Sequence, residues 1–244
     1  WHTGTFGQFE VSRIGPQDSR GATLGDFDND GDNDVFVCNY GRNYIWRNDG
    51  SRNFTSVVVP FGRKDDSRGA AVADFDGDGN LDIYVCSKHS DTLLLGNGDC
   101  TFEDKTKTNL PHEDVTSWRA VAFDYDGDGD LDIFVSKWGQ NRLLRNDGNG
   151  RFDYENNIPV DRSNSRDVAH FVRGGVHYLL VGNRGSLCRL YRVYEKRLFD
   201  VTAINLPIPA DFTYGVAVGD VNGDGIPDAY IANDGYDVLL FGRP

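Results

Sequence analysis

The chain has 244 residues, of which 39% are hydrophobic and 12% aromatic, so it can build the core of one large domain. Its net charge of −13 argues against nucleic acid as a partner, because phosphate binding needs a basic surface. No apolar run approaches the roughly 18 residues of a membrane-spanning helix, so we expect no membrane insertion. The four cysteines are expected to be buried free thiols, since Cys38 and Cys86 lie a whole repeat apart.

Four acidic stretches recur along the chain. They are DFDNDGDND (26–34), DFDGDGNLD (74–82), DYDGDGDLD (124–132) and DVNGDGIPD (220–228). Their first aspartates are 48, 50 and 96 residues apart, so a further unit is expected near residue 172, where VRGGVHY stands instead. A period near 48 predicts a radial or stacked repeat protein.

Each unit shows the pattern of four short strands. In the first unit the strands are expected at 21–27, 34–39, 44–47 and 53–59, with the acidic loop after the first strand and a turn, NDGS, at 48–51. In the fourth unit Gly174 and Gly175 predict a tight hairpin in place of the acidic loop. No segment shows a helical period. Four strands in every 40–50 residues are typical of a propeller blade.

We therefore predict one all-β domain over residues 1–244, a five-bladed β-propeller of four-stranded blades. The repeats are expected near 13–60, 61–110, 111–160, 161–207 and 208–244. The last unit has only three strands, and residues 4–12 are expected to complete it and close the ring, because Phe9 matches Phe54, Phe102 and Phe152. Closure removes sticky sheet edges. The alternative is a fragment of a larger propeller.

The acidic loops supply the hard oxygen ligands that Ca²⁺ prefers, from positions 1, 3, 5 and 9 and from the carbonyl at position 7. Glycine at position 6 permits the sharp bend. We expect four structural calcium sites, of which the last is the weakest because Asn222 removes a charge. The expected ligands are Asp26, Asp28, Asp30, Asp32 and Asp34; Asp74, Asp76, Asp78, Asn80 and Asp82; Asp124, Asp126, Asp128, Asp130 and Asp132; and Asp220, Asn222, Asp224, Ile226 and Asp228.

These motifs resemble the FG-GAP and VCBS repeat family over nearly the whole chain. The resemblance rests on DFDGDGxxDI(Y/F)V followed by (N/D)xLLxNDGxGxF, and it breaks in the fourth repeat, where the loop is lost. The family includes integrin α-chain propellers, acidic extracellular matrix proteins and propeller lectins. It implies an extracellular, calcium-binding protein, and the sequon Asn53-Phe54-Thr55 is consistent with secretion.

The face opposite the acidic loops is formed by the links between strands two and three and by the crossings between units; we call it the link face. Four arginines and Tyr214 are placed at one repeat position there, before the inner strands, where they either pair with nearby aspartates or form an anion- or sugar-binding mouth. Exposed aromatic rings beside polar groups suit sugars and proteins equally. The candidate ligand-binding residues are Arg20, Tyr40, Arg68, His89, Trp118, Arg119, Trp138, Arg166, Arg184, Tyr214 and Tyr236.

Three classes of function remain open at this stage. The leading hypothesis is a secreted, calcium-stabilised module with lectin-like binding of glycans or glycoproteins. The second is a protein-interaction or adhesion module of the extracellular matrix. An enzyme, such as a sugar lyase or dehydratase, is disfavoured because no nucleophile–base constellation stands out. His170 and His177 face each other across the Gly-Gly hairpin, either as a zinc pair lacking an evident third ligand or as ordinary half-buried histidines.

Overall fold

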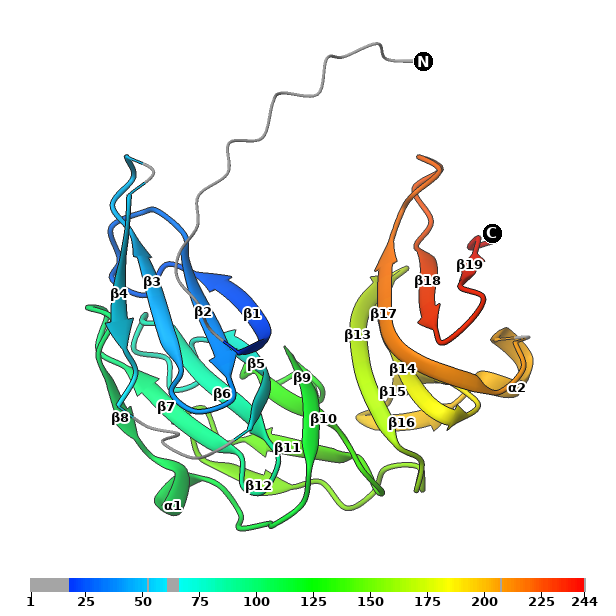
Figure 1. Cartoon of the computed structure of the whole chain (residues 1–244). Helices are drawn as coiled ribbons and strands as arrows, with labels where there is room; N and C mark the ends of the chain where they lie inside the picture. Colours follow the sequence, from blue (N-terminus) through cyan, green and yellow to red (C-terminus); the bar gives the residue numbers. More distant parts are fainter. Residues whose placement is uncertain (1–17, 52, 61–65, 207, 244) are drawn as a thin grey trace.

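The computed structural model describes residues 18–51, 53–60, 66–206 and 208–243, and these form a succession of antiparallel sheets (Figure 1). The first sheet contains β1 (Ser19–Gly25), β2 (Asp34–Asn39), β3 (Tyr44–Asn48) and β4 (Phe54–Val58). The second contains β5 (Ser67–Ala73), β6 (Asp82–Ser87), β7 (Thr92–Gly96) and β8 (Phe102–Asp104). The third contains β9 (Ser117–Phe123), β10 (Asp132–Lys137), β11 (Arg142–Asn146) and β12 (Phe152–Tyr154).

The remaining strands form one seven-stranded sheet. They are β13 (Ser165–Arg173), β14 (Val176–Ser186), β15 (Arg189–Tyr194), β16 (Arg197–Asp200), β17 (Asp211–Gly219), β18 (Asp228–Asn233) and β19 (Val238–Leu240). The sheet comprises two sequence units, 165–200 and 211–240, joined where the end of β14 pairs with the start of β17, Arg184 opposite Phe212. The same kind of junction is a single bridge elsewhere, between Tyr40 and Asp66 and between Trp138 and Asn164.

The sheets follow one another in an arc, with the first strand of each unit on the inside (Figure 1). β1 packs against β5, β5 against β9, β9 against β13 and β13 against β17. These inner strands are rich in Ala, Gly and Val, which suits close approach of one backbone to the next, whereas β2, β6 and β10 are continuous apolar runs buried on both faces. Four apolar clusters fill the four successive junctions between units.

Ring closure stays a prediction. Residues 4–12, which are expected to complete the last unit, lie outside the described residues. Within the described ranges, packing comparable to the other junctions does not connect β17 with β1. The face of the last unit that would meet a following sheet is open: Val221 is 62% exposed, whereas its equivalents Phe27 and Phe75 are at most 2% exposed.

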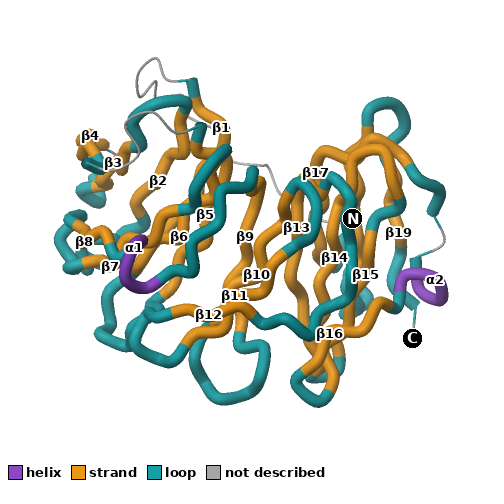
Figure 2. Tube along the Cα trace, turned by 90° about the horizontal axis from the view of Figure 1, so that it is seen from below, coloured by secondary structure: helices purple, strands orange, loops and turns teal. Residues whose placement is uncertain are grey.

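Two one-turn helices, α1 (Thr106–Asn109) and α2 (Thr202–Asn205), lie at the periphery (Figure 2), although the sequence shows no helical period. Each follows the last strand of a unit and is fixed by the same two contacts. Thr106 accepts a hydrogen bond from Leu93 N at 3.0 Å and donates its own N–H to Asp104 at 2.9 Å. Thr202 repeats both contacts with Leu190 and Asp200. Neither helix of the described ranges has the length and hydropathy to cross a membrane.

Candidate functional site

The acidic loops are built on two aspartates that bind backbone N–H groups. The first aspartate gathers the loop: Asp74 accepts from Gly77 N at 2.8 Å and Gly79 N at 2.9 Å, and Asp26, Asp124 and Asp220 accept equivalent bonds. The ninth aspartate connects the loop to the third strand: Asp82 accepts from Phe75 N at 2.7 Å and Gly96 N at 2.8 Å. Asp34, Asp132 and Asp228 do the same in their units. These carboxylates therefore shape the loop itself.

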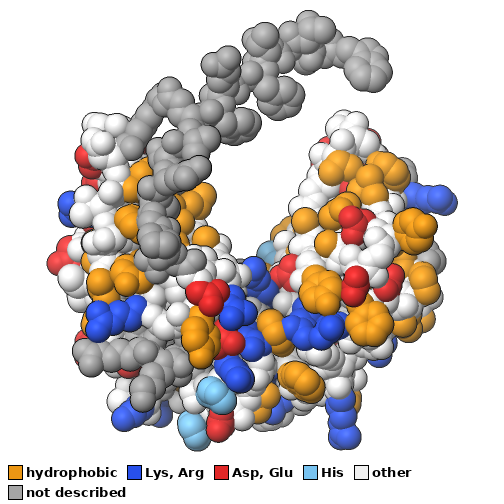
Figure 3. Space-filling model, viewed as in Figure 1, with side chains coloured by type: hydrophobic (Ala, Val, Ile, Leu, Met, Phe, Trp, Pro, Cys, Tyr) orange, Lys and Arg blue, Asp and Glu red, His pale blue; other side chains and the backbone are white. Residues whose placement is uncertain are grey.

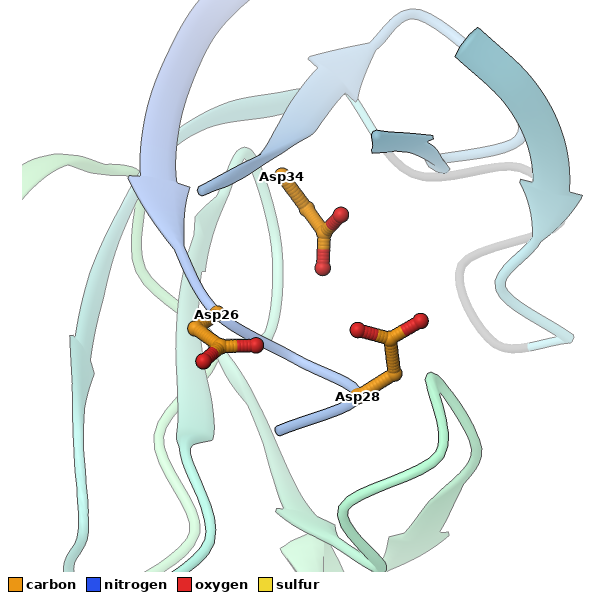
Figure 4. Close-up of side chains that lie close together, drawn as sticks. All are labelled: Asp26, Asp28 and Asp34. Atoms are coloured by element: carbon orange, nitrogen blue, oxygen red, sulfur yellow. The ribbon is translucent and has the colours of Figure 1, made fainter. Parts of the chain in front are cut away.

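In the first and third loops, the third position carries a carboxylate oxygen that remains free to bind a cation. Asp28 Oδ1 and Asp126 Oδ1 are buried and have no hydrogen-bond partner among the described residues. Carboxylate oxygens lie within 4.8 Å of one another in three groups: Asp26, Asp28 and Asp34; Asp74, Asp76 and Asp78; and Asp124, Asp126 and Asp132. Figure 4 shows the first group, in which the three carboxylates point toward one another. Such all-oxygen clusters fit a hard divalent cation.

Burial and mutual repulsion raise the pKa of several loop carboxyls. Burial raises the pKa of Asp82 to about 7 and that of Asp132 to about 6, against the hydrogen bonds that they accept. Burial also raises the pKa of Asp28 and Asp76, and neighbouring aspartates raise it further. A cation among these oxygens would reverse the repulsion, because an opposite charge favours the ionised form.

The loops are not equivalent. In the first and third units an arginine of the third strand stands beside the free aspartate: Arg145 lies 2.7 Å from Asp126, and Arg47 lies 3.8 Å from Asp28. The second unit has Leu95 at that place. In the last loop Asn222 replaces the aspartate and donates to Asp224 at 3.0 Å, and the described residues there form no cluster of three carboxylates. The last loop thus has the weakest set of cation ligands.

The first two acidic loops also touch the following sheet. Asn146 Nδ2 and Gly150 N, both of the third unit, donate to Phe75 O of the second loop at 2.7 and 3.0 Å. Cys100 N donates to Phe27 O at 2.9 Å in the preceding junction. The loop phenylalanines pack edge-on against Phe102 and Phe152 of the next unit. These loops therefore join neighbouring units as well as the strands of their own unit.

On the link face, every inner strand begins with a β-bulge that displaces one residue from the pairing register. The bulged residues are Arg20, Arg68, Trp118, Arg166 and Tyr214. Arg119 was predicted to share this repeat position, which is wrong: the third bulge is at Trp118, six residues before its loop as in the other acidic units, and Arg119 follows it. Bulges re-aim side chains, and here all five, with Arg119, line one cavity of about 150 Å³.

Trp118 is clamped between two arginines in this cavity. The guanidinium carbons of Arg68 and Arg166 each lie 3.6 Å from the centroid of its ring. Because both faces of the ring are covered, Trp118 cannot stack on a sugar as expected, and instead fixes the two guanidinium groups by cation–π contact. Arg119 reaches across the inner strands to donate to Arg68 O at 3.1 Å. Gly69 makes room for it, since a Cβ there would lie 2.7 Å from Arg119 Cδ.

The other candidate residues of the link face lie outside this cavity. One repeat position on this face donates its backbone N–H to the crossing before its unit. The residues at that position are Tyr40, Lys88, Trp138, Arg184 and Asp234. Tyr40 and Trp138 are both 62% exposed, and Tyr236 is 92% exposed. His89 lies 3.7 Å from Asp114 on the surface. Arg184 lies over Tyr214, 5.4 Å from its ring centroid.

The histidines and cysteines behave as structural residues in the described ranges. His170 Nε2 lies 2.9 Å from His177 Nδ1, and the stacked rings cover Phe123. Burial beside His177 lowers the pKa of His170 to about 4, and the pair belongs to no metal-binding cluster of described residues. Gly174 and Gly175 form the predicted two-residue turn, both with positive φ. All four cysteines are buried free thiols, as expected.

A second cavity, of about 200 Å³, lies between the second and third sheets and was not foreseen from the sequence. Glu113 stands in its wall and accepts from Lys137 at 2.5 Å and Arg142 at 2.8 Å. Asp91, which is half-buried, accepts from Tyr84 at 2.6 Å and Ser117 at 2.7 Å. These groups satisfy one another, so the network ties the two sheets together. The only sequence signal was a lysine, Lys137, within an apolar strand.

The repeating units of the chain match the sequence pattern of a known family. The sequence pattern of the FG-GAP-like repeat matches residues 26–85, 74–135 and 124–172, which together span more than half of the chain. The chain belongs to the FG-GAP-like repeat family. The three matched repeats each begin at an acidic loop, so the family pattern joins the loop of one unit to the strands of the next. No curated protein sequence matches the chain.

Solved structures show the same fold at low identity. A lectin of Agrocybe aegerita, described for specific recognition of non-reducing terminal N-acetylglucosamine, matches with a TM-score of 0.56 and 16% identity over 93% of this chain and 67% of the lectin. BBS1N in complex with ARL6DN matches with a TM-score of 0.58 and 11% identity over 96% of this chain and 71% of that one. At such identity these likenesses support a propeller-type fold for the FG-GAP-like repeats.

Proposed function

We propose that this FG-GAP-like protein is a secreted, calcium-stabilised β-propeller module that binds glycans or glycoproteins at its link face. The observation that carries the proposal is the convergence of five bulge residues, four of them arginine or tryptophan, on one cavity at the inner ends of the sheets. Exposed Tyr40 and Trp138 on the same face add aromatic surface suited to sugar rings. The lectin among the structural neighbours is consistent with this role.

Calcium is the cation that best suits the acidic loops. Asp28, Asp76 and Asp126, at the third position, would bind it together with the carboxylates clustered around them, which are Asp26 and Asp34, Asp74 and Asp78, and Asp124 and Asp132. When bound, the cation neutralises the clustered carboxylates and fixes the loop to both adjoining sheets. We propose three such sites in the first three units. A fourth, weaker site at Asp220, Asn222 and Asp224 remains a prediction from the sequence.

A glycan array probed with and without calcium tests the proposed function. We expect saccharide binding that is lost when a chelator unfolds the acidic loops. Binding to no saccharide, together with capture of a defined extracellular protein, would favour the alternative of a protein-interaction module. That alternative rests on exposed aromatic residues such as Tyr236, because aromatic side chains are enriched in protein interfaces. No observation on the described residues favours a lyase or dehydratase.

A further inference from the structure

The cavity lined by the bulge residues and Arg119, which we call the axial cavity, has a strongly positive lining. Four of its six lining residues are arginines and the other two are Trp118 and Tyr214, so no acidic side chain lines it. Figure 3 shows the basic side chains gathered at the middle of this face, between the two arms of the arc. In a chain with a net charge of −13, a concentration of positive charge at one point needs a specific explanation.

The aspartates beside the cavity balance only some of these arginines. Asp66 lies 3.2 Å from Arg68 and 3.9 Å from Arg20. Asp18 lies 3.5 Å from Arg20, and Asp167 lies 3.9 Å from Arg119. Arg166 has no acidic partner among the described residues. Its positive neighbours Arg184 and Arg68, together with burial, lower its pKa.

Several hydrogen-bond donors in this cluster are also unused. Arg68 Nη1, Trp118 Nε1 and Arg166 Nε are buried and donate to no group of the described residues. Because Trp118 holds both guanidinium groups in place, these donors are preorganised rather than free to swing into solvent. A fixed set of N–H donors with surplus positive charge is complementary to an oxyanion.

We propose that the axial cavity binds a single oxyanion group, a carboxylate or a sulfate, carried by a sugar residue. This inference rests on the proposed glycan-binding function. The group accepts hydrogen bonds from the unused donors of Arg68, Trp118 and Arg166 at the edge of the indole ring, whose two faces the guanidinium groups cover. Because residues from every unit contribute to one cavity, the chain binds one such group, rather than one ligand for each repeat.

Two matched sugar pairs test the inference by isothermal titration calorimetry at low and high salt. Methyl β-glucuronide is compared with methyl β-glucoside, and N-acetylglucosamine 6-sulfate with N-acetylglucosamine, so that the carboxylate and sulfate sources are separated. We expect the charged member of at least one pair to bind about tenfold more tightly, with one site per chain. Its affinity should fall as salt rises.

Substitution of the unpaired arginine localises the site. Arg166→Gln should weaken binding of the charged sugar about tenfold, and Arg166→Lys should restore part of it. Arg151→Gln changes an exposed arginine beside an NDG turn and should have no effect. A melting curve for each variant shows whether it is folded. Trp118→Phe, which keeps an aromatic spacer, offers a second test if Arg166→Gln fails to fold.

The outcomes separate the inference from the proposed function. If charged and neutral sugars bind equally, and Arg166→Gln binds both like the wild type, the anionic site is wrong while glycan binding stands. If sodium sulfate alone binds in an Arg166-dependent manner and no sugar binds, the cavity is an anion site without a glycan. That result overturns the proposed function, and it also overturns the part of the inference that a sugar carries the oxyanion. Binding of two or more charged sugars per chain also contradicts it.

Discussion

The acidic loops and the bulge residues lie at opposite ends of the same inner strands. From unit to unit the aspartates of the acidic loops recur, whereas the side chain at the bulge changes. At the acidic end the aspartate side chains themselves accept backbone N–H bonds, as Asp74 and Asp82 do, so changing them would undo the loop. At the bulge end the link is held by backbone groups, as where Lys88 N donates to Asp66 O, and by side chains beside the bulge, as where Thr116 Oγ1 donates to Lys88 O. The side chain at the bulge is therefore free to be arginine, tryptophan or tyrosine.

Removing calcium should have the largest effect on the free energy of unfolding, because it acts on the acidic loops of three units at once. With millimolar calcium and three sites of about 10⁻⁴–10⁻³ M affinity, the cation contributes about 1–4 kcal/mol to the free energy of unfolding, or roughly 3–15 °C in Tm. Differential scanning calorimetry with calcium, magnesium or a chelator measures this. A Tm that is the same in all three would show that the loops are stable without a cation.

Substituting Gly69 should have the next largest effect, at the bulge end. In Gly69→Ala the new Cβ would meet Arg119 Cδ and, at 2.8 Å, Trp118 O, so we expect a loss of about 1–3 kcal/mol in the free energy of unfolding. The matched variant Gly215→Ala, in the last unit, meets nothing closer than 3.6 Å and should be nearly neutral. Denaturant unfolding compares them. Equal losses would mean that a further strand packs beside β17 in solution.

The third position of the acidic loop should decide how strongly each loop binds calcium. Asp76→Asn gives the second loop the side chain that the last loop has at Asn222, and should remove up to about 1 kcal/mol of the calcium-dependent stability. Asn222→Asp is the reciprocal change and should raise calcium-dependent stability. Calcium titration followed by Tm distinguishes the two. No difference between Asp76→Asn and wild type would show that position three is not a ligand.

The fourth unit, whose Gly-Gly hairpin replaces the acidic loop, should lose stability as pH falls, in the same sense as a carboxyl stabilised by calcium but at a higher pH. His170 is held neutral with a pKa of about 4, below its unfolded value near 6.5, so it binds protons only in the unfolded chain within that window. Its contribution is complete above pH 6.5 and is lost as pH falls toward 4. His170→Phe should therefore show a smaller fall in Tm over this window than wild type, and an identical fall would contradict the assignment.

The sequence predicted the parts of the fold that repeat, because strand, loop and turn residues return at a fixed spacing. The loops at 26–34 and 74–82, the NDG turns and the Gly174–Gly175 hairpin were all found in this way. Matching by residue type, however, aligned Arg119 with the other arginines, whereas counting six residues back from Asp124 gives Trp118. The spacing was thus a better guide than the chemistry of the side chain.

Contacts between units could not be predicted from the sequence. The clamp of Arg68 and Arg166 on Trp118 joins side chains from three sheets, and its geometry depends on how those sheets are rotated against one another. The network around Glu113 likewise joins a crossing to two strands of the third sheet. The helices α1 and α2 were missed because one turn is too short for a hydrophobic period, and each depends on a threonine that bonds a neighbouring strand.

The bonds from Asn146 and Gly150 to Phe75 O place the second loop at a joint between two sheets rather than at the tip of one. Cation occupancy there would consequently set the size of the cooperative unit in melting. With the ion bound, adjacent sheets would lose their order in a single transition; once it has left, each sheet could fray on its own. The concentration of free calcium around the protein would then act as a control on whether the chain behaves as one body or as several.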